Sequence, residues 1–155
     1  MKRLLAIVMT LAFSCSEKEE TLNSKLLGAW EATYFAEDLG FESVNRYIFL
    51  SDGSYFYEWG YRVLGETEMT GYHNIWTGNY LTAGDQLTLQ TLRVFSPPNM
   101  VTQPPFVPKD QLEEKSVSPS ETNRFQFQIS NDRSTLTVRH SKMDMDGATF
   151  QRVDE

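Results

Sequence analysis

The stretch Val44-Asn-Arg-Tyr-Ile-Phe-Leu-Ser-Asp-Gly-Ser-Tyr-Phe-Tyr-Glu-Trp-Gly-Tyr61 has the pattern of two β-strands joined by a tight turn. Its centre, Ser51-Asp-Gly-Ser54, favours reversal of the chain, because Gly accepts positive φ and Asp bonds to nearby backbone. By the two-residue period of a strand, the aromatic residues of the second half share one face: Tyr55, Tyr57, Trp59 and Tyr61. The stretch therefore predicts an antiparallel hairpin with an aromatic face.

Similar strand patterns recur from Lys25 onward, and most of them are separated by short turns. Besides the two strands of the hairpin they are Leu26–Phe35, Tyr72–Leu81, Gln86–Phe95, Phe125–Ile129, Leu136–His140 and Ala148–Val153. Strands joined by tight turns are antiparallel, and eight of them naturally close into a barrel that leaves no exposed edge. We therefore predict an all-β domain over residues 25–155, an eight-stranded antiparallel up-and-down β-barrel.

Residues 96–121 interrupt this pattern, because they hold all six prolines of the chain. Proline cannot donate to a strand ladder, so the segment is predicted to be a loop of about 25 residues. Its middle, Lys109–Lys115, has the composition of a turn or two of helix beginning after Pro108. A loop of this length is able to fold over one mouth of the barrel.

The N-terminus has the layout of a secretory signal that ends in a cysteine. Lys2 and Arg3 precede an apolar run, Leu4–Phe13, and Ser14 and Cys15 close it. We predict that residues 1–14 are a lipoprotein signal peptide, that Cys15 carries the lipid, and that residues 15–24 form an acidic tether. Lipoprotein signals usually have Leu and then a small residue in the two positions before Ser14, where this chain has Ala and Phe. An uncut membrane anchor, a buried helix and an ordinary signal peptide therefore remain as alternatives.

The net charge of the mature chain argues against some classes of binding partner. The whole chain has 14 basic and 21 acidic residues, and residues 1–14 hold two of the bases, which leaves 12 − 21 = −9. This argues against nucleic acid and against direct adsorption to anionic lipid. The acidic run Ser16–Glu20 resembles the export tag of surface lipoproteins in some Gram-negative bacteria, or is a plain tether. We therefore expect an outer-membrane lipoprotein, attached through Cys15 and facing either the cell surface or the periplasm.

Four motifs of the domain resemble the lipocalin-like domain common in small bacterial lipoproteins: Gly28-Ala-Trp30, the hairpin Tyr47–Phe56, the hairpin Trp76–Leu89 and the ending Thr149–Val153. The resemblance covers nearly the whole mature chain. It implies a binding or structural module whose ligand differs from member to member. It also implies that Arg152 packs across Trp30 as a cation–π contact and closes the base of the barrel.

Catalytic and metal-binding chemistry is not predicted. His73 and His140 lie on separate strands with no cysteine partner, and we expect both to face solvent. Asp144-Met-Asp-Gly147 is similar to the start of a calcium loop but lacks the distal Glu. Ser14, Ser116 and Ser118 lack the sequence context of a nucleophile. The expectation is a protein without enzymatic activity, metal ion or cofactor.

The aromatic faces are the remaining functional signal. The candidate ligand-binding residues are Tyr34, Tyr55, Tyr57, Trp59 and Trp76. The competing interpretation is that these side chains only fill the barrel, as aromatic residues do in small barrels. We predict a site for a small apolar or amphipathic ligand. The alternative is an interaction module with a solid core that contacts another envelope protein or a glycan.

Overall fold

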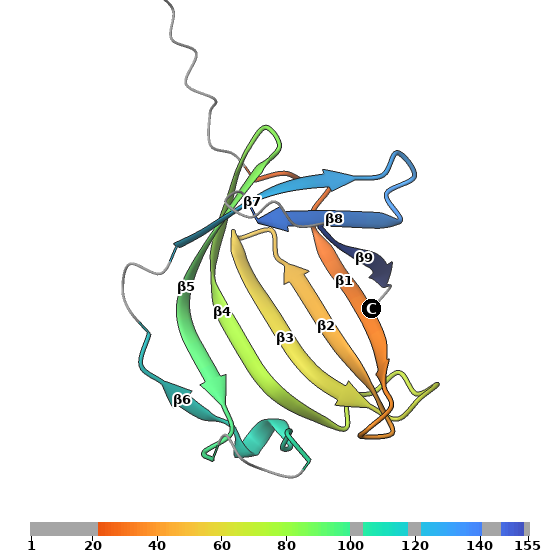
Figure 1. Cartoon of the computed structure of the whole chain (residues 1–155). Helices are drawn as coiled ribbons and strands as arrows, with labels where there is room; N and C mark the ends of the chain where they lie inside the picture. The colour runs from red at the N-terminus through yellow and green to blue at the C-terminus, as the bar shows by residue number, and fades with distance from the viewer. Residues whose placement is uncertain (1–21, 100–103, 118–121, 141–146, 154–155) are drawn as a thin grey trace, which may run out of the picture.

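A computed structural model describes residues 22–99, 104–117, 122–140 and 147–153 of the chain (Figure 1). The predicted signal peptide, Cys15 and the first part of the tether lie outside the described residues. So do Asp144 and Asp146 of the calcium-like motif, and two short parts of the proline-rich segment.

The described chain forms one sheet that closes on itself. Its strands are β1 Gly28–Ala36, β2 Phe41–Phe49, β3 Ser54–Arg62, β4 Gly71–Ala83, β5 Gln86–Ser96, β6 Glu113–Lys115, β7 Thr122–Ile129, β8 Thr135–His140 and β9 Ala148–Val153, with a 3₁₀ turn η1 at Lys109–Gln111. Every pairing is antiparallel, and β9 returns to β1. Eight strands make the ring, and β6 pairs with β5 outside it. The predicted fold class is therefore confirmed.

Two of the pairings that close the ring are short. β9 pairs with β1 only over Ala29–Glu31, whereas β2 follows β1 along its whole length. Likewise, β7 pairs with β5 only over Gln86–Gln90, and β6 takes the far end of β5. Figure 1 shows the result: β1–β5 form one tall curved wall, and β7–β9 cross only one end of it.

The hairpin between β2 and β3 has the predicted turn. The carboxylate of Asp52 accepts hydrogen bonds from the backbone N–H of Ser54 at 2.9 Å and from its hydroxyl at 2.6 Å. These hydrogen bonds lower the pKa of Asp52. Gly53 has φ +85°, a conformation that a side chain would strain. Local side-chain chemistry therefore sets the register of the hairpin.

The core fills the end of the barrel where the described chain begins. Trp30 is fully buried, and its indole N–H donates to the carbonyl of Leu26 at 2.8 Å. The guanidinium of Arg152 lies 4.5 Å from the Trp30 ring, which is the arrangement predicted from the resemblance. Gly28 has φ +107°, and a Cβ there would lie 3.3 Å from Nη1 of Arg152. The residues packed above this base include Tyr47, Phe49, Tyr55, Tyr80, Leu87, Leu89, Leu136 and Phe150.

The described part of the proline-rich segment packs against the opposite end. The ring of Phe106 lies 5.1 Å from Phe41 and 5.0 Å from Tyr61. Val107 exchanges backbone hydrogen bonds with Tyr72 at 2.8 and 3.1 Å. The predicted helix is corrected: after Pro108 only the short η1 forms, and the next residues pair with β5 as β6. This strand is Glu113-Glu-Lys115, which has no apolar alternation to indicate a strand. None of the described helical segments is long and apolar enough to span a membrane.

Candidate ligand site

A cavity of about 250 Å³ lies on the inner face of the barrel, next to the packed core. Strands β2, β3, β4, β5 and β7 contribute to its wall. The lining residues are Tyr47, Tyr55, Tyr57, Trp76, Leu89, Thr91, Asn123 and Phe125. The volume is a little below the usual range for drug-sized ligands, so it suits a small molecule.

Strand register brings the aromatic residues of this wall together. Tyr47 pairs with Tyr57, and Tyr57 pairs with Trp76 on the next strand. Directly opposed residues point to the same face of a sheet, so the three rings line up across β2, β3 and β4. Their centroids are 4.6 and 5.2 Å apart. The ring planes are tilted by 52° and 55° to one another, and together they offer an apolar surface to the cavity.

Hydroxyl groups give the same wall a polar component. The Tyr57 hydroxyl donates to Oδ1 of Asn45 at 2.6 Å, and the Tyr55 hydroxyl lies 2.9 Å from Oγ1 of Thr91. Tyr47 is only 9% exposed. Among the residues that the structure describes, its hydroxyl has no hydrogen-bond partner. No fully buried side-chain nitrogen or oxygen atom of the described residues lacks a hydrogen-bond partner, so this unpaired hydroxyl is open to the cavity. It is therefore available to a polar atom of a ligand or to water.

The cavity wall is uncharged. None of its described lining residues is acidic or basic. Burial raises the pKa of Tyr57 to about 12 and raises the pKa of Tyr47 still further. Both phenols therefore stay protonated over the physiological range, and each can donate and accept a hydrogen bond. The site fits an uncharged ligand that has both an apolar face and a polar atom.

The five predicted ligand-binding residues divide into two groups. Tyr55, Tyr57 and Trp76 line the cavity. Trp59 lies further along the same face, where its N–H donates to Oγ of Ser43 at 3.2 Å. Tyr34 is 53% exposed and is not part of the lining.

Sequence reasoning missed Tyr47, Leu89, Thr91, Asn123 and Phe125 as lining residues. The alternation of β2 was sufficient to find Tyr47, because a hairpin register places it opposite Tyr57. The positions of Asn123 and Phe125 depend on the pairing of β7 with β5 across the long loop. No local pattern carries that information.

The histidines differ from the expectation, because both are half-buried rather than solvent-facing. Nδ1 of His73 lies 2.7 Å from the carbonyl of Pro105, and its ring lies 4.3 Å from Trp59. The ring of His140 packs edge-on against Phe125 at 5.3 Å. Neighbouring loops and strands cover both rings. Within the described ranges, no group of three His, Cys, Asp or Glu side chains could hold a metal ion.

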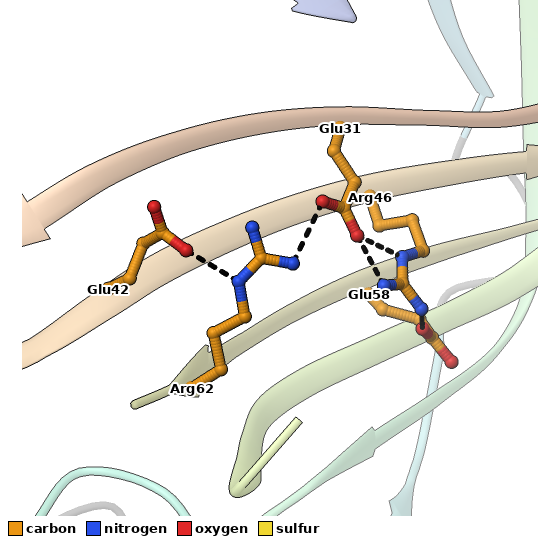
Figure 2. A network of polar contacts seen from close by, with 5 residues as sticks. All are labelled: Glu31, Glu42, Arg46, Glu58 and Arg62. Atoms are coloured by element: carbon orange, nitrogen blue, oxygen red, sulfur yellow. Dashed lines mark hydrogen bonds and ion pairs between the residues drawn. The ribbon is translucent and has the colours of Figure 1, made fainter. Parts of the chain in front are cut away.

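The outer face of β1, β2 and β3 has a network of ion pairs (Figure 2). Arg46 bonds to Glu31 and approaches Glu58 at 3.7 Å. Arg62 joins Glu31 at 3.1 Å and Glu42 at 2.5 Å. The side chains of Glu31 and Glu58 are only 7% and 5% exposed. A buried carboxylate needs such partners, so the network is needed to balance the charge on this face.

A second hollow lies on the outer face of β3, β4 and β5, on the opposite side of the sheet from the cavity. Its volume is about 540 Å³, and η1 and the residue after it form one wall. The lining is mainly apolar and includes Phe56, Ile75, Leu92, Phe95 and Leu112. We call it the outer groove. It is larger than the inner cavity.

Comparison with known proteins adds no identification. No protein-family model matches the chain, and no curated protein or solved structure gives a significant match. Functional inference therefore depends on the residues and their geometry.

Proposed function

We propose that the barrel binds a small, uncharged amphipathic molecule in its inner cavity. The observation that carries this proposal is the Tyr47 hydroxyl, which is open to the cavity and has no hydrogen-bond partner among the described residues. The row formed by Tyr47, Tyr57 and Trp76 supplies an apolar face for stacking. Thr91 and Asn123 add polar atoms on the other strands. This combination is typical of small-molecule sites, which pair apolar walls with a few polar groups.

Titration with N-phenyl-1-naphthylamine, an uncharged amphipathic dye, tests this function. Trp76→Leu removes one ring of the cavity wall, and we expect it to weaken dye binding about tenfold, or about 1.4 kcal/mol. Tyr34→Leu is the matched control, because Tyr34 lies outside the cavity lining. It should leave the affinity unchanged. Absence of binding by the unmodified protein, or equal affinity of both variants, would count against the inner cavity as the site.

The same proposal places the protein at the outer membrane of a Gram-negative cell, held by a lipid on Cys15. Support comes from the signal-like pattern of residues 1–15 and from the acidic tether behind it. Cys15→Ala should move the protein from the membrane fraction to the soluble fraction. If the variant still sediments with membranes, the lipid anchor is wrong. Protease treatment of intact cells distinguishes a surface-exposed domain from one that faces the periplasm.

An interaction module is the second candidate, and one observation favours it. Tyr34 and Phe35 are 53% and 48% exposed near the end of β1. Phe106 of the proline-rich segment packs at this same end, against Phe41. A photoreactive residue in place of Phe35 would crosslink an envelope protein or a glycan if this end is an interface. The same residue in place of Leu81, an exposed side chain on β4, serves as the control.

A further inference from the structure

The outer groove has the lining of a lipid-chain site. Its residues come from β3, β4, β5 and the stretch around η1, and six of them are large apolar or aromatic residues. Phe56 and Leu92 are 36% and 53% exposed, so the groove leaves large apolar side chains in contact with water. Its volume of about 540 Å³ is within the usual range of ligand pockets. An apolar chain lying in it would remove this surface from water.

The charges at the groove favour an uncharged occupant. Lys109 and Arg93 are the two cations of its lining. Lys109 pairs with Glu58 at 3.1 Å, and Arg93 forms two hydrogen bonds with Glu114, at 3.0 and 2.8 Å. Each cation therefore already has a carboxylate partner. A free fatty acid would bring another carboxylate, which would compete with Glu58 or Glu114, whereas the acyl chain of an ester or amide brings no charge.

The N-terminal end of the described chain lies close to this groove. The side chain of Leu22 lies against the turn between β2 and β3, since a Cβ on Gly53 would be 3.5 Å from Cδ2 of Leu22. Ser54, the next residue, lines the groove. Residues 15–21 connect Leu22 to Cys15, and seven extended residues span about 25 Å. The tether is therefore long enough for a lipid on Cys15 to reach the groove.

We propose that the outer groove holds one acyl chain of the lipid on the protein's own Cys15 when the protein is outside a bilayer. The inference rests on the lipidation proposed above. A short tether gives the attached chain a millimolar effective concentration at the groove, which favours it over a free lipid of the same chemistry. The groove then shields part of the anchor from water until the protein meets a membrane.

Thiol labelling tests the proposal with the lipidated protein. In the lipidated chain the sulfur of Cys15 is a thioether, so Leu92→Cys introduces the only thiol. After detergent removal, we expect maleimide to label this thiol at least about tenfold more slowly than in the unlipidated mature chain carrying Cys15→Ser. Leu64→Cys, in the exposed loop after β3 and outside the groove, should be labelled equally fast in both forms. Phosphatidylcholine vesicles should restore fast labelling of the lipidated Leu92→Cys protein.

The possible outcomes distinguish failure of the groove proposal from failure of the lipid anchor. A mass measurement showing no acyl chains on Cys15 overturns both the lipidation and this inference. Lipidated protein whose Leu92→Cys thiol is labelled at the unlipidated rate overturns the inference alone. Protection of the unlipidated protein by added palmitate or monopalmitoylglycerol, without protection by lipidation, assigns the groove to free lipid and also overturns it.

A second pair of variants gives an independent readout. Leu92→Glu places a charge in the groove at an exposed position, so the fold is expected to tolerate it. The lipidated Leu92→Glu protein should form large assemblies when detergent is removed, because its acyl chain has lost its site. The lipidated Leu64→Glu protein should stay monomeric under the same conditions. Size-exclusion profiles that do not distinguish the two variants would contradict the proposal.

Discussion

Arg152 makes several contacts that require the planar guanidinium of an arginine. Its guanidinium lies over Trp30, donates to the carbonyls of Lys25 and Leu27 at 3.0 Å each, and donates to the carbonyl of Arg133 at 3.1 Å. A lysine ammonium is compact and cannot reach three carbonyls in different directions while lying over the ring. We expect Arg152→Lys to lower the free energy of unfolding by about 1–3 kcal/mol, measured by urea denaturation. A loss below about 0.5 kcal/mol would show that the contact is not stabilising.

The raised pKa of Tyr57 predicts how the free energy of unfolding changes with pH in the alkaline range. A free phenol ionises near pH 10, and folded Tyr57 ionises near about 12 because burial disfavours the phenolate. Between these pH values the unfolded chain has lost a proton that the folded chain keeps, so stability falls as pH rises. Tyr57→Phe should reduce the loss of unfolding free energy between pH 10 and pH 12 by about 2 kcal/mol.

Denaturation at pH 7 supplies the control for this pair of proteins. There the Tyr57→Phe change should cost only about 1 kcal/mol, for the hydrogen bond to Asn45. An identical alkaline loss in both proteins would mean that Tyr57 does not carry the linkage.

At the scale of elements, the Lys109–Glu58 pair fixes η1 against the outer face of β3. Lys109→Ala removes this contact, but Glu58 keeps Arg46 at 3.7 Å, and the lysine is 60% exposed. The effect on global stability should therefore be below about 1 kcal/mol. Hydrogen exchange should instead rise at the backbone N–H groups of Val107 and Leu112, which bond to Tyr72 and Lys109. Exchange elsewhere in the barrel should stay unchanged.

Lys115→Ala is the matched control for the η1 contact. Its ammonium pairs with Glu113, and both side chains are well exposed. This variant should leave the exchange at Val107 and Leu112 as it is in the unmodified protein. If both lysine variants accelerate exchange equally, the Lys109–Glu58 pair has no special part in holding η1.

The elements that could be predicted from the sequence are those formed by residues close to one another in the chain. Asp52 and Gly53 lie within the turn that they create, so both the hairpin and its register were accessible. The strand β6 was not, because it lies within the proline-rich segment and, among the described strands, pairs only with the far end of β5. The same limit applies to the candidate site. Tyr57 and Trp76 were identified from an aromatic pattern, whereas Asn123 reaches the cavity only through the closure of the ring.

The ion-pair network was not predictable either, because its partners are far apart in the sequence. Glu31 and Arg62 are 31 residues apart, and nothing in the sequence near either one indicates a partner. Alternation along β3 does show that Glu58 and Arg62 lie on the face opposite to Tyr57. What it cannot show is that these side chains become buried on the outer face. That burial depends on η1, on the neighbouring strands and on the loop before β4, where the methyl group of Met69 lies over Gly60.

For the whole molecule, closure of the ring depends on its last strand. β9 pairs with both β1 and β8, Phe150 is 4% exposed in the core, and Arg152 reaches Trp30. Deleting residues 148–155 therefore leaves two strand edges unpaired and removes part of the core. We expect the truncated chain to lose cooperative unfolding and to self-associate, measured by urea denaturation and size-exclusion chromatography. A chain that lacks only residues 154–155 keeps β9 and should behave as the full protein does. A monomeric, cooperatively unfolding chain without β9 would mean that β1–β8 suffice for the fold and that ring closure is not what stabilises it.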